Sequence, residues 1–322
     1  YMFPPRDPIL EKAGVFLAEL YEIIGDVYGT ANAPRIWAYV VIDAAIGAGF
    51  KQHSLDKMFF YYYDGDRLLC VMIVYVDDFL GTCSVDFNLD LVKDLFDWGS
   101  FKFGDDGEIR FKGNEINTHC VDGKFETHVT QREFTRALAP QKISRSRLAS
   151  DPKFQGDEHS EFRSCDGSLQ WLAGRTRPDG AASTSLANHG EDTGILQLKE
   201  MYDTMEYIQQ TEEVGIRFQA IPLDKDTVIV SFGDCSWANC HDGKSQEGIL
   251  ITLTTLGCFK DKTPCSVLDW RSCRTPGVIR STIAGEACAG DHAVDRAVHL
   301  SAFLSQILYN ESAVHNPPRL RH

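Results

Sequence analysis

Residues 59–80 carry the pattern that most constrains how this chain can fold. Two runs rich in aromatic and β-branched residues, 59–63 and 68–76, flank an Asp-Gly pair, and this combination is the strongest short-range indication of a β-hairpin. The adjacent carboxylates Asp77 and Asp78 follow the second run directly and precede another apolar pair. We therefore expect antiparallel strands joined by a second tight turn that presents both carboxylates.

The Asp77-Asp78 pair indicates a cation site. Adjacent carboxylates repel each other unless a cation neutralises them, and Mg²⁺ prefers one or two carboxylates together with substrate phosphates. Such a pair suits two-metal phosphoryl transfer, in which the metals stabilise the attacking and the leaving oxygen. An exposed acidic turn without a ligand is the alternative that the pair by itself leaves open.

The C-terminal third predicts a second compact element. Residues 227–232, 248–252 and 266–270 are typical of strands, and residues 281–308 contain no proline and suit a long helix. The expected order is therefore three strands followed by a helix. Upstream, Thr130 and Glu133 have the spacing of a capping box, which predicts the start of a short helix.

Composition limits the classes of protein that fit. The chain has 322 residues, 43% of them hydrophobic, which is enough for about two domains with real cores. The longest apolar run, 68–76, is far shorter than the ~20 residues of a membrane-spanning helix. No signal-peptide pattern is present, and the ten cysteines show no CxxC pair, so we expect reduced thiols, an intracellular protein and no membrane partner.

Charge gives a mixed indication about nucleic acids. The formal net charge of −14 argues against a phosphate-rich partner. Residues 131–150 are locally basic, however, with Arg132 and Arg136 at the start of the expected short helix. These arginines are candidates for phosphate contacts, and a solvated helix face is the alternative.

Several short motifs resemble one family when they are taken in order along the chain. They are Tyr28 to Trp37 (YGTANAPRIW), Gly49-Phe50-Lys51, the Tyr75 to Asp78 box (YVDD), Phe111 to Ile116 (FKGNEI), Thr130-Gln131, and Gly167 to Ala173 (GSLQWLA) followed by Thr176 to Asp179 (TRPD). These boxes resemble the reverse transcriptase region of copia-type LTR retrotransposon Pol polyproteins. Further on, Gly233 to Ala238 (GDCSWA) and Ser281 to Ala287 (STIAGEA) resemble the family's ribonuclease H region.

The resemblance implies an α/β (α+β) fold in three segments. Residues 1–148 would form a reverse transcriptase palm and thumb-like region, 149–225 a connecting segment, and 226–322 an incomplete ribonuclease H-like domain. The implied activities are RNA-directed DNA synthesis and hydrolysis of RNA in RNA-DNA hybrids. The implied partners are an RNA template, a DNA primer, the RNA-DNA hybrid and deoxynucleoside triphosphates, and the implied location is a cytoplasmic particle or the nucleus.

The resemblance also assigns residues to roles. The residues implied to be catalytic and to hold Mg²⁺ (or Mn²⁺) are Asp77, Asp78, Asp234 and Glu286. The residues implied to contact nucleic acid are Gly29, Pro34, Arg35, Tyr75, Arg132 and Arg136.

The chain also departs from the family pattern. The polymerase site should have a further carboxylate on a strand before residue 1, and the ribonuclease H site should have a further Asp after the last helix, where residues 309–322 contain none. Each site therefore holds part of its expected ligand set, which would lower activity by orders of magnitude. Two alternatives stay open: a catalytically inactive retroelement remnant that binds nucleic acid weakly, and an unrelated acidic metal-binding or protein-interaction module. The sequence makes no prediction of oligomeric state.

Overall fold

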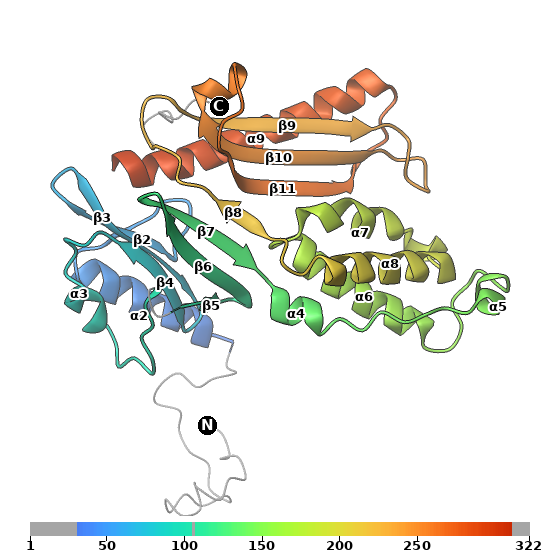
Figure 1. The fold of residues 1–322 in the computed structure, drawn as a ribbon, viewed down its shortest axis with the longest axis horizontal. Coiled ribbons are helices and arrows are strands. Elements are labelled where there is room, and N and C mark those ends of the chain that lie inside the picture. Colours follow the sequence, from blue (N-terminus) through green and yellow to red (C-terminus); the bar gives the residue numbers. More distant parts are fainter. Residues whose placement is uncertain (1–30, 105–106, 311–322) are drawn as a thin grey trace, which may run out of the picture. The chain divides into compact units, whose positions relative to one another are not determined.

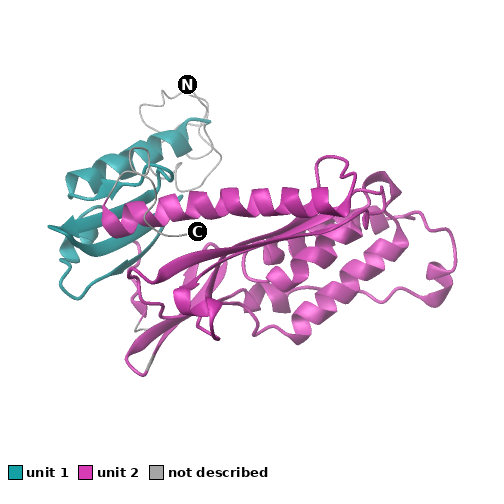
Figure 2. Ribbon diagram, turned by 90° about the horizontal axis from the view of Figure 1, so that it is seen from above, with its two compact units in different colours: residues 1–98 teal, residues 99–322 magenta. Residues whose placement is uncertain are grey.

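The computed structural model describes residues 31–104 and 107–310. The chain divides into two compact units, residues 1–98 and 99–322 (Figure 2). This division lies between residues 98 and 99, whereas the expected segment boundaries follow residues 148 and 225. Gly29 lies outside the described residues.

The first unit is a four-stranded antiparallel sheet with a helix packed on it. Its elements are α2 (Ala33–Gly47), β1 (Lys51–Gln52), β2 (Phe59–Asp64), β3 (Arg67–Tyr75), β4 (Asp78–Cys83) and α3 (Asp90–Lys93). The strand order is β1-β2-β3-β4 (Figure 1). The expected hairpin is confirmed: Asp64 pairs with Arg67, and Gly65 adopts φ +55° in the turn between them.

Apolar side chains of α2 and the sheet form the core of this unit. Val41 and Ala45 of α2 are buried in one cluster with Phe60, Met72 and Val74 of the strands. Met72 and Val74 are two positions apart on β3, so their side chains lie on the same face of that strand, against the helix. This packing fixes α2 beside the strands that carry the Asp pair.

The second unit begins with another antiparallel sheet. Its strands are β5 (Ile109–Phe111), β6 (Asn114–Val121), β7 (Lys124–Thr130) and β8 (Ile216–Phe218), in the order β5-β6-β7-β8. Strand β8 joins the sheet after an excursion of the chain through all the helices α4 to α8. Sequence proximity therefore does not set this edge of the sheet.

A short helix follows β7, as expected, but the predicted capping box between Thr130 and Glu133 does not form. Helix α4 (Arg132–Arg136) has Gln131 at its N-cap, with no side-chain cap. The Thr130 hydroxyl donates to Glu115 of β6, and Glu133 pairs with Arg110 of β5. Glu115 itself accepts from the backbone of the first helical turn, so a residue distant in sequence provides the cap.

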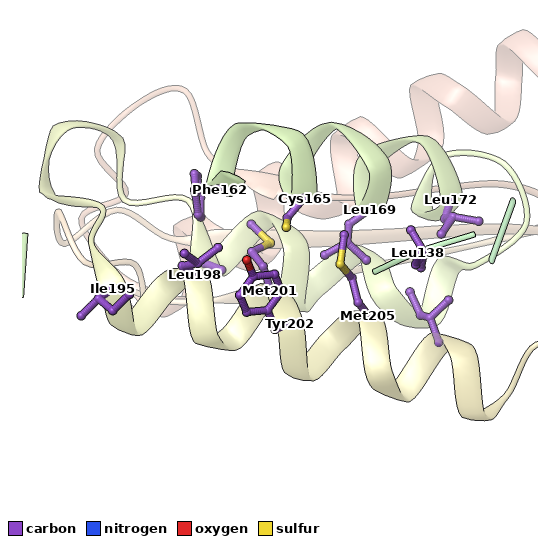
Figure 3. Packing of buried hydrophobic residues seen from close by; sticks show 12 residues of the cluster. Leu138, Phe162, Cys165, Leu169, Leu172, Ile195, Leu198, Met201, Tyr202 and Met205 are labelled. Carbon is purple, nitrogen blue, oxygen red and sulfur yellow. The ribbon is translucent and has the colours of Figure 1, made fainter. Parts of the chain in front are cut away.

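Helices form the middle of the second unit. They are α5 (Arg145–Leu148), α6 (Glu158–Ala173), η2 (Pro178–Gly180), α7 (Ala181–Ala187), η3 (Gly190–Asp192) and α8 (Ile195–Gln210). Figure 3 shows Leu169 of α6 beside Met205 of α8 and Cys165 of α6 beside Met201 of α8, all within one buried cluster. These apolar stripes hold the helices together.

The C-terminal part is a three-stranded sheet covered by the longest helix, and it confirms the expected order. Strands β9 (Thr227–Ser236), β10 (Gln246–Thr255) and β11 (Ser266–Arg274) pair in the order β11-β10-β9; η4 (Leu256–Phe259) follows β10, and α9 (Thr282–Tyr309) follows β11. The Ser281 hydroxyl caps α9 by accepting from the backbone of Ala284. Buried Ala293 and Ala297 pack α9 on the sheet. Small residues at this contact let the helix approach the strands closely.

The fold class is thus mixed α and β with antiparallel sheets, which agrees with the expected α+β class. Within residues 31–104 and 107–310, no helix is both long and apolar enough to cross a bilayer.

Candidate metal-binding turn and second carboxylate pair

The turn between β3 and β4 presents the Asp77-Asp78 pair on a strained backbone. Tyr75 and Asp78 are the last paired residues of the two strands, so Val76 and Asp77 form a two-residue turn. Val76 adopts φ +57° although it is β-branched, which is a genuine outlier, and its side chain is 55% exposed. Both aspartates are exposed. Strain of this kind persists only where the surroundings enforce it.

The surroundings of the turn supply that enforcement. The indole Nε1 of Trp37, on α2, donates a hydrogen bond of 2.5 Å to the carbonyl oxygen of Val76. Beside it lie the rings of Phe79, Phe96 and Trp98: Trp37 and Phe96 have centroids 5.3 Å apart, and Phe79 and Trp98 lie 4.8 Å apart. This aromatic cluster packs next to Asp78, since Phe79 is the following residue. Trp37 therefore connects the turn to this aromatic cluster.

Three described residues of this unit are expected to bind nucleic acid: Pro34, Arg35 and Tyr75. Pro34 occupies the first turn of α2, where its fixed φ suits a helix start. Arg35 is exposed, and its Nε donates to the Tyr39 hydroxyl at 3.3 Å. Tyr75, at the end of β3, is 47% exposed. Trp37, which sequence reasoning did not assign to the site, makes the direct contact with the turn; its place in the same motif as Arg35 was the available indication.

The second expected pair, Asp234 and Glu286, comes from β9 and α9. Both side chains are exposed. Cys235 is buried between the two elements: a Cβ at Gly285 of α9 would lie 2.8 Å from its sulfur. Burial raises the pKa of the Cys235 thiol, a hydrogen bond with Ser245 opposes this, and the charges of Glu286, Glu247 and Asp234 add to it.

Strand geometry separates the two carboxylates. Gly233 also contacts α9, since a Cβ there would lie 2.4 Å from the carbonyl oxygen of Ala289. Because side chains alternate along a strand, Asp234 points to the sheet face opposite α9, whereas Glu286 belongs to α9 itself. Among the residues that the structure describes, no group of three His, Cys, Asp or Glu side chains is arranged to hold a metal ion.

A buried carboxylate that sequence reasoning did not single out lies near this second pair. Glu247 of β10 is 1% exposed and contacts His292 Nδ1 of α9 at 2.8 Å. The Cys273 thiol donates to the same carboxylate. No local pattern marks Glu247, because its partners come from β11 and α9.

The basic residues Arg132 and Arg136 are engaged with carboxylates. Arg132 donates to Glu115 at 3.0 Å and also pairs with Glu108, and hydrogen bonding to Glu115 raises the pKa of its guanidinium. Arg136 donates to both oxygens of Glu212, at 2.8 and 2.6 Å. Both arginines of α4 are thus paired with acidic residues from other elements of the second unit.

Comparisons with known proteins add no assignment. The chain matches no family model, no curated protein and no solved structure. The chemistry of the two carboxylate pairs is therefore argued from their own geometry. Of the two, the β3–β4 turn has the arrangement better suited to a ligand, because both carboxylates are adjacent, exposed and held on a rigid support.

Proposed function

We propose that the chain is part of a copia-type reverse transcriptase and ribonuclease H, and that Asp77 and Asp78 hold Mg²⁺ or Mn²⁺ for phosphoryl transfer. The observation that carries this proposal is the tight turn in which Val76 is strained and fixed by Trp37. A site that binds a metal and substrate phosphates needs its ligands on rigid elements. An acidic turn without a ligand gains nothing from such a constraint.

The residues of the turn have separate roles in this proposal. Asp77 and Asp78 would hold the metal through their carboxylate oxygens, together with the phosphates of a deoxynucleoside triphosphate. When bound, the metal would stabilise the charge that develops on the oxygens of the reacting phosphate. Exposed Tyr75 flanks the pair and offers an aromatic face to the primer-template, which an RNA template and a DNA primer would form.

The ribonuclease H part of the proposal has narrower support. The strand and helix order of β9, β10, β11 and α9 agrees with the expected fold, and Asp234 and Glu286 lie on β9 and α9 as the resemblance implies. Their separation by strand alternation means that they act together only if a ligand joins them around the edge of the sheet. We therefore propose hydrolysis of RNA in RNA-DNA hybrids as a secondary activity, carried by residues 226–322.

A second candidate function is weak nucleic-acid binding without catalysis. The ion pairs of Arg132 and Arg136 favour it, because arginines engaged with carboxylates contribute less to phosphate binding. In that case affinity for an RNA-DNA hybrid would persist when the Asp pair is neutralised. It would also fall steeply with salt.

Primer extension tests the proposed polymerase activity. The chain is incubated with a DNA primer on an RNA template, deoxynucleoside triphosphates, and Mg²⁺ or Mn²⁺, and extension is compared with Asp77→Asn and Asp78→Asn. The matched control is Asp66→Asn, an exposed aspartate at the β2–β3 turn of the same sheet. Extension that the two site variants abolish and the control retains supports the proposal.

Direct metal binding separates the site from the activity. Terbium(III) bound at the turn would be excited through Tyr75, so its luminescence should decrease in Asp77→Asn and stay unchanged in Asp66→Asn. Metal binding without extension would favour the non-catalytic candidate. Equal luminescence in all three proteins would remove the metal site and with it the proposed function.

A further inference from the structure

Two cysteines face each other across the strand pair that carries the Asp turn. Cys70 of β3 is the register partner of Cys83 of β4. In the registers of the strands that the structure describes, no other two cysteines are direct partners. Both are free thiols. Strand register therefore brings these two thiols, and no other described pair of strand cysteines, directly opposite each other.

The register gives this pair the geometry that a cross-strand disulfide needs. Tyr75 and Asp78 close the two-residue turn as a hydrogen-bonded pair, and hydrogen-bonded and non-hydrogen-bonded pairs alternate from there. Counting back from the turn makes Cys70 and Cys83 a non-hydrogen-bonded pair. The next pair confirms the count, since Ser84 N donates to the carbonyl oxygen of Leu69 at 2.7 Å.

Distance follows from the type of pair. Residues in a non-hydrogen-bonded pair have Cα atoms ~4.5 Å apart, which falls within the ~4.4–6.8 Å found across disulfides. Side chains of directly opposed residues also lie on the same face of the sheet. A disulfide between these residues would therefore require little movement of either strand.

The environments of the two thiols differ in a way that suits stepwise oxidation. Cys70 is buried and Cys83 is exposed. Burial raises the pKa of Cys70 to about 12, with a smaller contribution from Cys83, and burial also raises the pKa of the Cys83 thiol. Because the thiolate is the nucleophile, the exchange should be faster at alkaline pH than at neutral pH. An oxidant from solution reaches Cys83 first, and Cys70 lies next to it.

We propose that Cys70 and Cys83 form a reversible disulfide that links β3 to β4 when a low-molecular-weight disulfide is the oxidant. The Cys83 sulfur attacks one sulfur of the oxidant, forms a mixed disulfide and releases one thiol. The Cys70 sulfur then attacks the Cys83 sulfur and releases the second thiol. In sum, the two protein thiols lose two electrons and two protons, and one oxidant disulfide becomes two thiols.

The link has a structural consequence for the neighbouring turn. It would close a loop that contains the whole Asp77-Asp78 hairpin tip, so the two strands could not separate when the sheet opens locally. Unfolding of the first unit should then require more denaturant. This effect does not depend on metal binding or on polymerase activity.

Mass spectrometry tests the link directly. The purified chain is incubated with oxidised glutathione, free thiols are alkylated, and the digest is searched for a Cys70–Cys83 cross-linked peptide. We expect that peptide to appear before any other cross-link, to disappear after reduction, and to be absent in Cys83→Ser. Cys288→Ser, which removes an exposed cysteine of α9, is the matched control and should leave the cross-link unchanged.

Unfolding provides the second measurement. The oxidised wild type should unfold at a higher urea midpoint than the reduced wild type, whereas Cys83→Ser should show the same midpoint under both conditions. Because Cys83 is exposed, its replacement by serine leaves the core intact. Glutathione attached at Cys83 without a cross-link, or cross-links that form first among other cysteines, would overturn the proposal.

Discussion

Glu115→Gln is the perturbation whose effect the structure defines most sharply. The Glu115 carboxylate, 5% exposed, accepts hydrogen bonds from Thr130 Oγ1 at 2.9 Å, Arg132 N and Nε at 3.0 Å, and Glu133 N at 2.8 Å. Burial opposes ionisation, but these hydrogen bonds outweigh it and lower the pKa of Glu115 to about 2. The negative charge is therefore bound more tightly in the folded state than in the unfolded chain.

The size of the effect follows from the pKa. Lowering it from 4.5 to about 2 corresponds to about 3 kcal/mol of folding free energy at neutral pH, at ~1.36 kcal/mol per pH unit. Because the pKa is depressed on folding, this stabilisation is complete above pH 4.5 and is lost as the pH falls toward 2. At pH 3 roughly 1.4 kcal/mol remains.

Glutamine keeps the shape of the side chain but carries no charge, so Glu115→Gln should lower the free energy of unfolding of the second unit by about 3 kcal/mol at pH 7. Urea denaturation followed by circular dichroism measures the total loss, and hydrogen exchange of the α4 amides locates it. Glu126→Gln, an exposed carboxylate on the adjacent strand β7, is the control and should change stability by less than ~0.5 kcal/mol. Equal stabilities of the two variants, or a loss that is as large at pH 3 as at pH 7, would refute the reasoning.

Three further substitutions test other contacts. Arg177→Met should destabilise the second unit by ~3–5 kcal/mol in urea denaturation, because Arg177 is 1% exposed and its guanidinium binds both a carboxylate and the last carbonyl oxygens of α8; a loss below ~1 kcal/mol would contradict this. Trp37→Phe keeps an aromatic ring but removes the hydrogen bond to Val76, so terbium luminescence at the turn should weaken while the thermal midpoint changes little; unchanged metal affinity would show that the turn does not depend on this bond. Gly233→Ala places a methyl group 2.4 Å from the carbonyl oxygen of Ala289, so α9 must shift and the thermal midpoint should fall. Gly248→Ala, which has open space around it, is the control and should lower the midpoint less. Equal losses in the two variants would argue against the close helix contact.

The two hairpin turns show why part of the fold was predictable. The Asp-Gly pair and the flanking β-rich runs determine β2 and β3, because turn chemistry and side-chain alternation act over a few residues. The same local reasoning placed Asp77 and Asp78 at the following turn. It could not show that Val76 is strained there, since the hydrogen bond that fixes Val76 comes from a residue on α2.

Local reasoning failed where distant chain segments meet. Thr130 and Glu133 have the spacing of a capping box, yet Glu115 caps α4, because a buried carboxylate on the neighbouring strand reaches the same amides. The ion pair between Arg136 of α4 and Glu212, which follows α8, was likewise not visible in the spacing of either segment. Spacing within one segment contains no information about such partners.

The sequence by itself determined the β2–β3 hairpin, the short helix after β7, and the order of three strands and a helix in the C-terminal part, because these depend on local periodicity and turn residues. It also supplied the carboxylates that we propose as metal ligands. The tertiary structure alone decided which of those residues come together. It fixed the Asp turn against Trp37, directed Asp234 and Glu286 from different sides of one sheet, and opposed Cys70 to Cys83. The physical reason is that these arrangements depend on strand register and on packing between elements far apart in the chain, and neither is set by neighbouring residues.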